Sequence, residues 1–503
     1  MMGNEKNIVK EPKKKILLFS IILIDIISVG IIPLNLFVIN MPEYISIIIS
    51  VGILLLNIML WFAGKQRKAV KAVLSLVSLV TALFSLFGTY CNPYWNSLFY
   101  RTNYTITVKD DSMILSQDKA LADLDYAMKY LRKLHPALYS GIPEDIQNQY
   151  ERSKQNLINC EQIDICTLIR EIESIFSLLH DAHTHVVAVY NEQHYLKYIA
   201  EHNEAGDRLI KINGIPLEEL FQANSHLVSY ETEDWGMTYI YEYVSSAEGL
   251  EYLGISIEDG VEYTYENVNG EQISFVFTAD DFVTYQEYAE FNGIDTDADT
   301  DVSFVHYEID AENDIAILTL DSCDNNEEYR NCLHNMFAEI KEQGIGNVAV
   351  DLRNNGGGDS SVANEFFRYL NIDSYKEWAD VWRMGFFKIK NNGAERKNDN
   401  YEDFLFDGNL YLLTSVHTFS SAMDFAMLVK DNHLGTIIGE APGNHPGSYG
   451  QIAFFTLPNS GLYMQISTKK WFRVDETLGD QLIEPDISSE AKNAVEYLYN
   501  AIQ

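Results

Sequence analysis

Basic residues are scarce in this sequence of 503 residues, which has 36 lysines and arginines against 73 aspartates and glutamates. The formal net charge of -37 repels a phosphate backbone, so the composition excludes nucleic acid as a partner. Cysteine is also scarce, with five residues and no C-x-x-C pair, which disfavours both a disulfide framework and a zinc-ribbon site. The chain is otherwise globular in composition, and its length predicts two to four domains.

The charge is unevenly distributed along the chain. Up to Asn92 there are nine basic and four acidic residues, and this part contains three apolar runs over residues 16–40, 44–63 and 72–90. Each run reaches the roughly 20 residues needed to cross a bilayer. Because two more runs follow the first, a cleaved signal peptide is disfavoured. The sequence therefore predicts three transmembrane helices, with the lipid bilayer as a partner.

The basic residues in this part also predict an orientation. Lysines precede the first run, and lysines and an arginine separate the second run from the third. By the positive-inside rule the N-terminus is cytoplasmic, and everything after Tyr90 lies outside. We therefore expect a multi-pass protein of a bacterial cell membrane whose large acidic part is extracytoplasmic.

The rest of the chain predicts a multi-domain α+β protein. We expect a membrane region (1–92), an N-terminal helical region (93–192), a β-rich region (193–310) and an α/β core (311–503). Apolar residues at helical spacing predict the helix before His180, and Asn269-Gly270 predicts a hairpin in the β-rich region. In the core, strands alternate with helices, which predicts a mostly parallel sheet with its active loops at the carboxyl ends of the strands.

Two loops of the core contain residues suited to an acyl-transfer site. Ser420 lies where a predicted strand turns into a helix, so its hydroxyl could act as a nucleophile near the positive helix end. Alternatively, Ser420 or Ser421 merely caps that helix. The glycine-rich turn 354–358 could present backbone N–H groups to an oxyanion or a phosphate, or be a plain turn. It is not a P-loop, because no Lys-Ser/Thr follows it.

A third loop is rich in histidine. His180, His183 and His185 lie within six residues at the predicted end of a helix. They could include a general base or bind a metal, or they could be three ordinary histidines at a helix end. The His-x-x-His spacing has no glutamate between its histidines, so the metalloprotease signature is missing and we predict no metal site.

Four motifs occur in one order: Val348-Ala349-Val350-Asp351-Leu352-Arg353-Asn354-Asn355-Gly356-Gly357-Gly358, Thr418-Phe419-Ser420-Ser421-Ala422-Met423-Asp424-Phe425-Ala426, Gly439-Glu440 and Glu484-Pro485-Asp486-Ile487. Together they resemble the motifs of the C-terminal processing (tail-specific) serine peptidases. That group also includes the tricorn core protease and interphotoreceptor retinoid-binding protein. The resemblance spans roughly residues 118–490 and implies an α/β serine peptidase core of the ClpP/crotonase-like type.

The resemblance also implies roles for individual residues. Ser420 matches the family nucleophile, while Ser421 and Gly357, or Gly356, would supply the oxyanion-binding amides. The tail-specific branch uses a lysine base, but this chain has no lysine between Lys430 and Lys469. The tricorn-like branch uses a histidine instead.

That histidine lies in a motif similar to Asp181-Ala182-His183-Thr184, so we predict His183 as the base. Histidine also has a suitable pKa to activate a serine near neutral pH. In tricorn-like enzymes a glutamate near the final Pro-Asp motif orients the base, and Asp475 and Glu476 are the candidates here. Glu440 and His445 are further candidates for this catalytic network.

The family's substrate-binding PDZ domain has only a partial counterpart. Residues 206–214 resemble one strand of such a domain, but the following sequence lacks its closing pattern. We therefore predict only a PDZ-like fragment within the β-rich region.

The predicted function is that of a membrane-anchored serine peptidase that hydrolyses extracytoplasmic proteins or peptides through an acyl-enzyme, without a cofactor. Two alternatives remain open. One is a non-catalytic peptide- or lipid-binding protein on the same fold. The other is a metal-dependent hydrolase that uses His180, His183 and His185.

Overall fold

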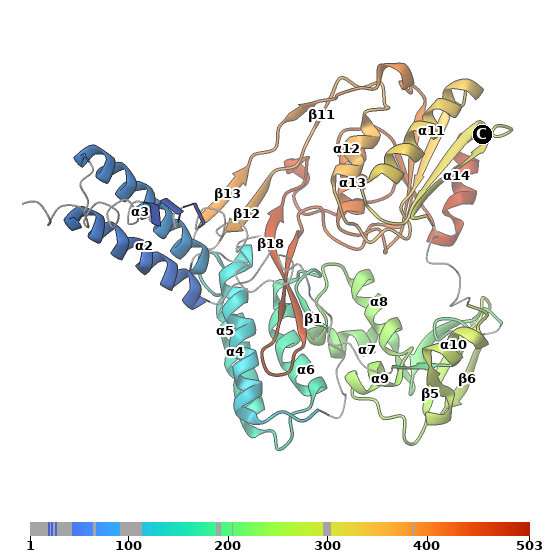
Figure 1. Cartoon of the computed structure of the whole chain (residues 1–503). Coiled ribbons are helices and arrows are strands. Elements are labelled where there is room, and N and C mark those ends of the chain that lie inside the picture. The colour runs from blue at the N-terminus through green and yellow to red at the C-terminus, as the bar shows by residue number, and fades with distance from the viewer. Residues whose placement is uncertain are drawn as a thin grey trace, which may run out of the picture.

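The fold is that of a computed structural model. It describes residues 43–63, 67–90, 113–187, 193–203, 205–294, 303–384 and 387–503, with Phe19, Ser20, Ile22, Leu23, Ile26 and Ile27 before them. A helical hairpin projects from one end of the molecule, and the remaining elements form an α/β core, a helical region and a mixed region (Figure 1).

The N-terminal hairpin consists of α2 (Glu43–Ala63) and α3 (Lys68–Tyr90). Among the residues that the structure describes, no helix is both long enough and apolar enough to cross a membrane. The prediction of three transmembrane helices is therefore wrong, and the prediction of the bilayer as their partner is without support. Most of the first predicted run lies outside the described residues.

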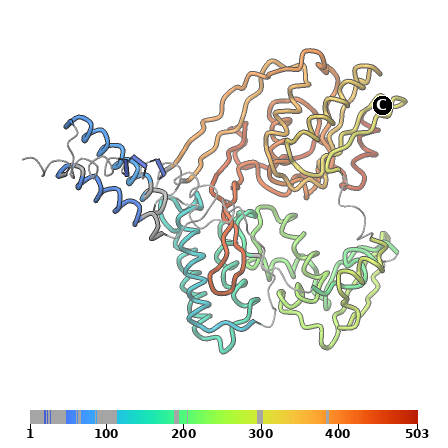
Figure 2. The backbone as a smooth tube through the Cα atoms, in the orientation of Figure 1, coloured from blue at the N-terminus to red at the C-terminus, as the bar shows by residue number. Residues whose placement is uncertain are grey.

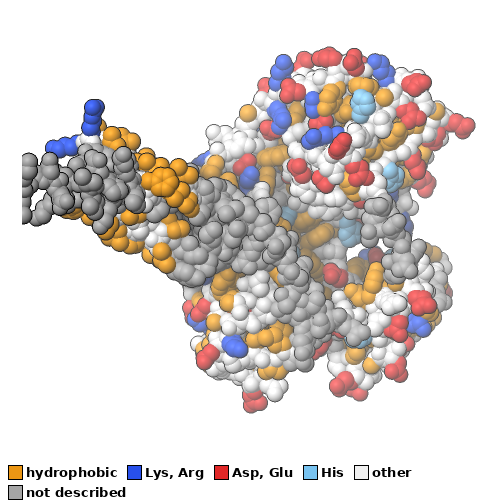
Figure 3. All heavy atoms as spheres, in the orientation of Figure 1, with side chains coloured by type: hydrophobic (Ala, Val, Ile, Leu, Met, Phe, Trp, Pro, Cys, Tyr) orange, Lys and Arg blue, Asp and Glu red, His pale blue; other side chains and the backbone are white. Residues whose placement is uncertain are grey.

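Polar groups interrupt the apolar character of this hairpin. Lys68 and Lys71 lie inside α3 rather than before it. Ser75 donates a hydrogen bond to Asn57 Oδ1 (3.3 Å), and the indole of Trp61 donates to Ser75 Oγ (2.8 Å). Counting apolar residues in a run ignores such contacts between helices. Figure 3 shows hydrophobic side chains over the hairpin and acidic ones over the rest of the molecule.

The helical region confirms the predicted apolar periodicity. Its main helices are α4 (Gln117–Leu134), α5 (Glu144–Asn159) and α6 (Ile165–Phe176). Asp164 caps α6 by accepting a hydrogen bond from Thr167 N–H (2.6 Å), and the helix buries the apolar face that the spacing predicts. One 3₁₀ turn (Ser177–Leu179) follows and ends at His180, which has a left-handed conformation (φ 48°).

The region predicted to be β-rich is mixed. Its elements are β2 (His194–Leu196), β3 (Arg208–Ile212), β4 (Ile215–Pro216), α7 (Leu217–Asn224), α8 (Glu233–Tyr243), α9 (Ala247–Tyr252), β5 (Val261–Glu266), β6 (Gln272–Phe277), β7 (Phe282–Thr284) and α10 (Tyr285–Phe291). The Asn269-Gly270 hairpin joins β5 to β6 as predicted. The side chains of Thr232 and Ser246 cap the N-termini of α8 and α9. These caps are local helix signals, but the aromatic composition of the region favoured strands instead.

The α/β core confirms the predicted alternation of strands and helices. It contains β8 (Val305–Asp310), β9 (Ile315–Leu320), α11 (Glu327–Gln343), β10 (Asn347–Asp351), α12 (Ser361–Phe367), β15 (Asn409–Thr414), α13 (Ser421–Asp431), β16 (Thr436–Gly439), β19 (Ile487–Ser488) and α14 (Ala494–Ile502). The sheet order is β19-β16-β15-β10-β9-β8, parallel except for the β8–β9 pair.

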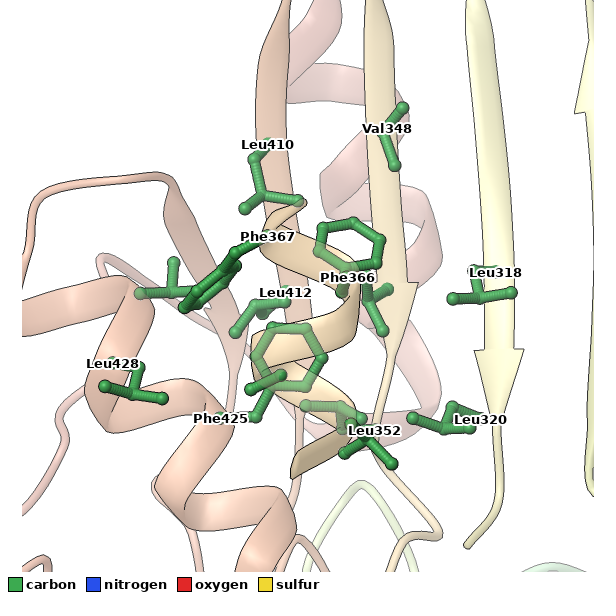
Figure 4. Close-up of a cluster of buried hydrophobic side chains, with 14 of the residues drawn as sticks. Leu318, Leu320, Val348, Leu352, Phe366, Phe367, Leu410, Leu412, Phe425 and Leu428 are labelled. Carbon is green, nitrogen blue, oxygen red and sulfur yellow. The ribbon is translucent and has the colours of Figure 1, made fainter. Parts of the chain in front are cut away.

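Both faces of this sheet are covered. Side chains from β9, β10 and β15 meet those of α12 and α13 in the largest buried cluster, which includes Leu318, Val348, Phe366, Leu412 and Phe425 (Figure 4). The other face packs against α14. Because the parallel strands are buried on both faces, they read as continuous apolar runs, and their carboxyl ends meet at one edge where the motif loops lie.

A second sheet connects the core to the helical region. It contains β1 (His185–Val187), β12 (Asp380–Met384), β13 (Phe387–Asn391), β17 (Tyr449–Thr456) and β18 (Tyr463–Trp471), while β11 (Ser374–Lys376) pairs with β14 (Glu395–Lys397). The β17–β18 hairpin runs from the core along α4 and α6 (Figure 2), and Phe455 and Met464 belong to the buried cluster of the helices. Strand β1 pairs with β18, which ties the histidine loop to the core.

The tip of this hairpin depends on one buried carboxylate, Asp123 of α4. It accepts hydrogen bonds from Asn459 N–H (2.9 Å) and Nδ2 (2.8 Å) and from Ser460 N–H (2.7 Å). We expect Asp123→Ala to lower the free energy of unfolding of the helical region by about 2–4 kcal/mol, because buried backbone donors lose their acceptor. Urea denaturation followed by circular dichroism measures this. Glu161→Gln, at an exposed position, is the control, and equal stability of both variants would contradict the expectation.

Candidate active site

Ser420 lies in a strained turn at the carboxyl end of β15. Its backbone has φ 54° and ψ -122°, an unfavourable region for a residue with a Cβ. α13 starts at the next residue, and Asn444 Oδ1 accepts the Ser420 N–H (2.8 Å). A half-buried serine held in a strained strand-to-helix turn is the arrangement that nucleophilic serines use in other α/β folds.

The glycine-rich loop after β10 packs directly against this turn. A Cβ on Gly357 (φ 102°) would lie 2.7 Å from Ser420 Cβ and 2.9 Å from Ser421 N. The Gly357 N–H donates to Asn355 Oδ1 (2.9 Å), whereas Ser421 N–H lies at the first position of α13, where a helix has no intrahelical acceptor to offer. The structure thus brings Gly357 and Ser421, both predicted oxyanion donors, beside Ser420.

The side chains beneath the nucleophile turn form a buried polar network. Ser421 Oγ donates to Gly358 O (2.8 Å) and lies 2.8 Å from Ser360 Oγ, which donates to Asp424 (3.0 Å). Burial raises the pKa of Asp424 to about 7. This network fixes the side chain of Ser421 on the side of the turn that faces the glycine loop.

The histidine loop reaches the nucleophile turn from the helical region. Asp181 Oδ1 accepts the backbone N–H of His183 (2.9 Å), and Asp181 Oδ2 accepts the hydroxyl of Thr184 (2.6 Å). The imidazole of His183 lies on Phe419, the neighbour of Ser420, with ring centroids 4.8 Å apart. The predicted base therefore contacts the residue next to the predicted nucleophile.

Two carboxylates set the charge state of His183. Its Nδ1 lies 3.7 Å from Asp181 Oδ1 and 3.9 Å from Glu231 Oε1, and its side chain is 10% exposed. Burial lowers the pKa of His183, but the two carboxylates outweigh it and raise the pKa to about 9. Among the described residues, neither ring nitrogen has a hydrogen-bond partner. The surroundings of the ring thus favour its protonated form.

Asp181 is itself held by the end of α4. His135 Nε2 lies 3.0 Å from Asp181 Oδ2, and His135 Nδ1 accepts the Ala137 N–H (3.3 Å), so Nε2 carries the proton and donates it to Asp181. Burial raises the pKa of Asp181, but the hydrogen bonds from His135 and the charge of His183 hold it well below its usual range. Asp181 therefore stays ionised.

Several predicted residues lie elsewhere or have other partners. The Asp475 side chain accepts hydrogen bonds from Thr477 (3.0 and 2.7 Å), and the neighbouring Glu476 is exposed. Glu440 accepts the backbone N–H groups of Ala491 (2.9 Å) and Val416 (3.3 Å). None of these carboxylates contacts His183 in the described part of the chain, so their orienting role stays a prediction without support.

The remaining histidines are also engaged. His445 Nδ1 lies 2.9 Å from Asp480 O, and its backbone N–H donates to Glu231 Oε2 (2.9 Å). His185 Nδ1 lies 3.1 Å from Ala182 O. The rings of His180 and Tyr230 make an edge-to-face contact. His180, His183 and His185 do not form a ligand group in the described part of the chain.

A different group of side chains could hold a metal ion. Asp181, His183 and Glu231 each offer one ligand atom, and these atoms lie within 4.8 Å of one another. One oxygen of each carboxylate already accepts a backbone hydrogen bond: Asp181 Oδ1 from His183 N–H and Glu231 Oε2 from His445 N–H. The arrangement is equally that of a base with two orienting carboxylates.

Sequence reasoning missed Glu231, Asn444 and His135. Glu231 comes from the region predicted as β strands, 189 positions before Ser420. No spacing rule connects it to the histidine loop, and only the packing of α8 against the core does so. Asn444 lies in the stretch that the resemblance aligned with a lysine, so it could have been noticed there.

A cavity of about 290 Å³ adjoins the histidine loop. Its lining includes Glu173, His185 and Ser229. His185 lies two positions after His183, and Ser229 lies two positions before Glu231. Burial raises the pKa of Glu173 to about 8, although Val186 N–H and Ser229 Oγ both donate to it. The cavity thus contains a buried carboxyl that is mostly protonated at neutral pH.

Comparison with known proteins finds one similarity to a described family. Residues 314–489 of the α/β core match the family model described as Peptidase family S41. The match covers the core and not the preceding regions of the chain. The branch within the family stays a prediction. A comparison with curated proteins found no relative.

Solved structures share the fold at low sequence identity. Mature CPAF complexed with lactacystin is 12% identical, with a TM-score of 0.56 over 77% of this chain and 98% of that chain. Mature CPAF alone is 11% identical, with a TM-score of 0.56 over 77% and 96%. The photosystem II D1 C-terminal processing protease is 12% identical, with a TM-score of 0.42 over 76% and 97%. The TM-scores of 0.56 show that this chain shares its fold with CPAF, and no more.

The contact between Gly357 and Ser420 predicts different effects for two adjacent glycines. A Cβ on Gly357 would displace Ser420 and the neighbouring amides, whereas a Cβ on Gly356 meets nothing within 4 Å in the described part of the chain. We expect Gly357→Ala to slow covalent labelling of Ser420 by a fluorophosphonate roughly 10²-fold, because the displaced backbone N–H groups no longer reach the oxyanion. Gly356→Ala is the matched control and should label within about threefold of the native rate. Equal rates for both variants would contradict the assignment of Gly357.

Proposed function

We propose that this protein is a serine peptidase that cleaves proteins or peptides through an acyl-enzyme, with Ser420 as the nucleophile and His183 as the base. The observation that carries the proposal is the strained turn of Ser420 beside the imidazole of His183, since the ring of His183 lies on Phe419. A strained serine, a nearby base and adjacent backbone amides are the three parts that acyl transfer requires.

The mechanism follows from the positions of these groups. His183 Nε2 takes the proton of Ser420 Oγ as the oxygen attacks the peptide carbonyl, and the Ser421 and Gly357 N–H groups stabilise the oxyanion. Gly357 N–H exchanges its bond to Asn355 for one to the oxyanion. The imidazolium then protonates the leaving amine, and water releases the acyl group in a second cycle.

One specific observation favours the alternative of a binding protein without catalysis. Among the described residues, His183 Nε2 has no hydrogen-bond partner, so the bond between Ser420 and His183 is not formed in this conformation. Catalytic hydrogen bonds often tighten only when substrate is bound, which keeps the peptidase as the first proposal. The extracytoplasmic location stays a prediction from the sequence.

Three variants separate the candidate roles. We expect Ser420→Ala and His183→Ala each to lower kcat/KM for an unfolded protein substrate by at least roughly 10³-fold, because both remove the activated nucleophile. His445→Ala should lose less than about tenfold, since its ring contacts Asp480 O rather than the nucleophile turn. His417→Ala, an exposed histidine in the same turn, is the control. Full activity of Ser420→Ala, or activity lost with EDTA, would contradict the serine mechanism.

The raised pKa of His183 predicts an alkaline pH profile. A general base acts only when it is neutral, so a pKa of about 9 means that kcat/KM rises as the pH increases from 7 through 9. A histidine with its ordinary pKa would reach a plateau near pH 7.5, about one unit above 6.5. Measurement of kcat/KM between about pH 6 and pH 10 distinguishes these cases. A plateau at the lower pH would contradict the assigned surroundings of His183.

A further inference from the structure

We infer that Glu231 is the positioning residue of His183: one carboxylate oxygen accepts a hydrogen bond from the imidazolium Nδ1–H, while the other fixes the loop that holds Ser420. This inference rests on the proposed function and deepens it. It assigns the mixed region between the helices and the core a part in catalysis, which neither the motifs nor the family comparison supplies.

The first argument is the state of the two Glu231 oxygens. Oε2 accepts the His445 N–H (2.9 Å), which fixes the orientation of the carboxylate. Oε1 is buried and has no hydrogen-bond partner among the described residues, and it lies 3.9 Å from His183 Nδ1, which is also unpartnered. The Glu231 side chain is 2% exposed. A buried carboxylate oxygen without a donor is costly, so a proton on Nδ1 would satisfy both atoms with a small movement.

The second argument is that Asp181 is already committed to other donors. Its oxygens already accept three hydrogen bonds, from His183 N–H, Thr184 Oγ1 and His135 Nε2. These bonds hold the loop backbone rather than the ring. Of the two carboxylates near Nδ1, therefore, only Glu231 keeps an oxygen that no other described donor occupies.

The third argument is that the residues around Glu231 hold the other side of the active site. Thr232 Oγ1 donates to Gly443 O (2.8 Å), and Trp235 stacks on Phe419 with ring centroids 4.3 Å apart. The loop fixed in this way carries Asn444, whose Oδ1 accepts the Ser420 N–H. Glu231 thus lies beside the base, His183. Through its bond to His445 it also holds the loop whose Asn444 fixes Ser420.

The proton on His183 responds to several charged groups, so the test must isolate Glu231. Asp181 and Glu231 face Nδ1, while His185 and Asp424 influence the ring from β1 and α13. Replacing Glu231 with glutamine removes one negative charge and keeps the side-chain oxygen that accepts the His445 N–H. This variant therefore removes the effect of the Glu231 charge on the protonation of His183, while the hydrogen bond that fixes the loop remains.

The experiment measures kcat, KM and the pH dependence of kcat/KM for three variants. We expect Glu231→Gln to lower kcat about 10- to 100-fold, to leave KM within about threefold, and to shift the acid limb down by roughly one pH unit. Glu231→Asp keeps the charge and should restore part of kcat and the position of the acid limb. Glu233→Gln, an exposed glutamate two positions away, should behave as the native protein.

Two results would overturn the inference. One is an unchanged acid limb in Glu231→Gln, and the other is a Glu231→Asp variant as inactive as Glu231→Gln. The rate of fluorophosphonate labelling at Ser420 against pH is the second readout, and it needs no peptide substrate. Failure of native Ser420 to label would reject the proposed function itself. Labelling with a pH dependence that Glu231→Gln does not change would reject only the role of Glu231.

Discussion

The carboxylate of Asp181 is the interaction on which the active site depends. It joins the end of α4, through His135, to the loop of His183, through a backbone N–H and the Thr184 hydroxyl. Thr184 Oγ1 in turn accepts the Ser467 N–H of β18 (3.0 Å), so the same network reaches the second sheet. Burial raises the pKa of Asp181, but the hydrogen bonds from these donors and the nearby histidines lower it by more, so the carboxylate remains ionised.

The rest of the site assembles around that loop from parts far apart in the sequence. The parallel sheet brings the glycine loop after β10 and the turn after β15 to one edge, while the β17–β18 hairpin holds the helical region against the core. The mixed region adds Glu231 and Trp235 from the remaining side. The helical region, the mixed region and the core therefore all contribute residues to the candidate active site.

The sequence predicted the core and the turn at Ser420 well, because local signals define them, whereas the roles of Ser420 and His183 stay predictions. Continuous apolar runs that alternate with helical segments predict the strands. The position of Ser420 between a strand and a helix predicts its turn. His183 was found through a motif. Glu231 could not be predicted, since its role arises from contact across 48 positions with a loop to which no pattern connects it. The spanning helices were predicted wrongly, because a run of apolar residues does not show which polar groups meet between helices.

The central claim, that Ser420 forms a covalent acyl-enzyme with His183 as its base, can be tested by trapping the intermediate. A peptide p-nitrophenyl ester mixed with the native protein and quenched in acid should leave one acyl group per chain, and peptide mapping by mass spectrometry should place it on Ser420. His183→Ala should accumulate the same adduct much more slowly. An acyl group on another residue, or turnover with no covalent adduct in the native protein, would contradict the account.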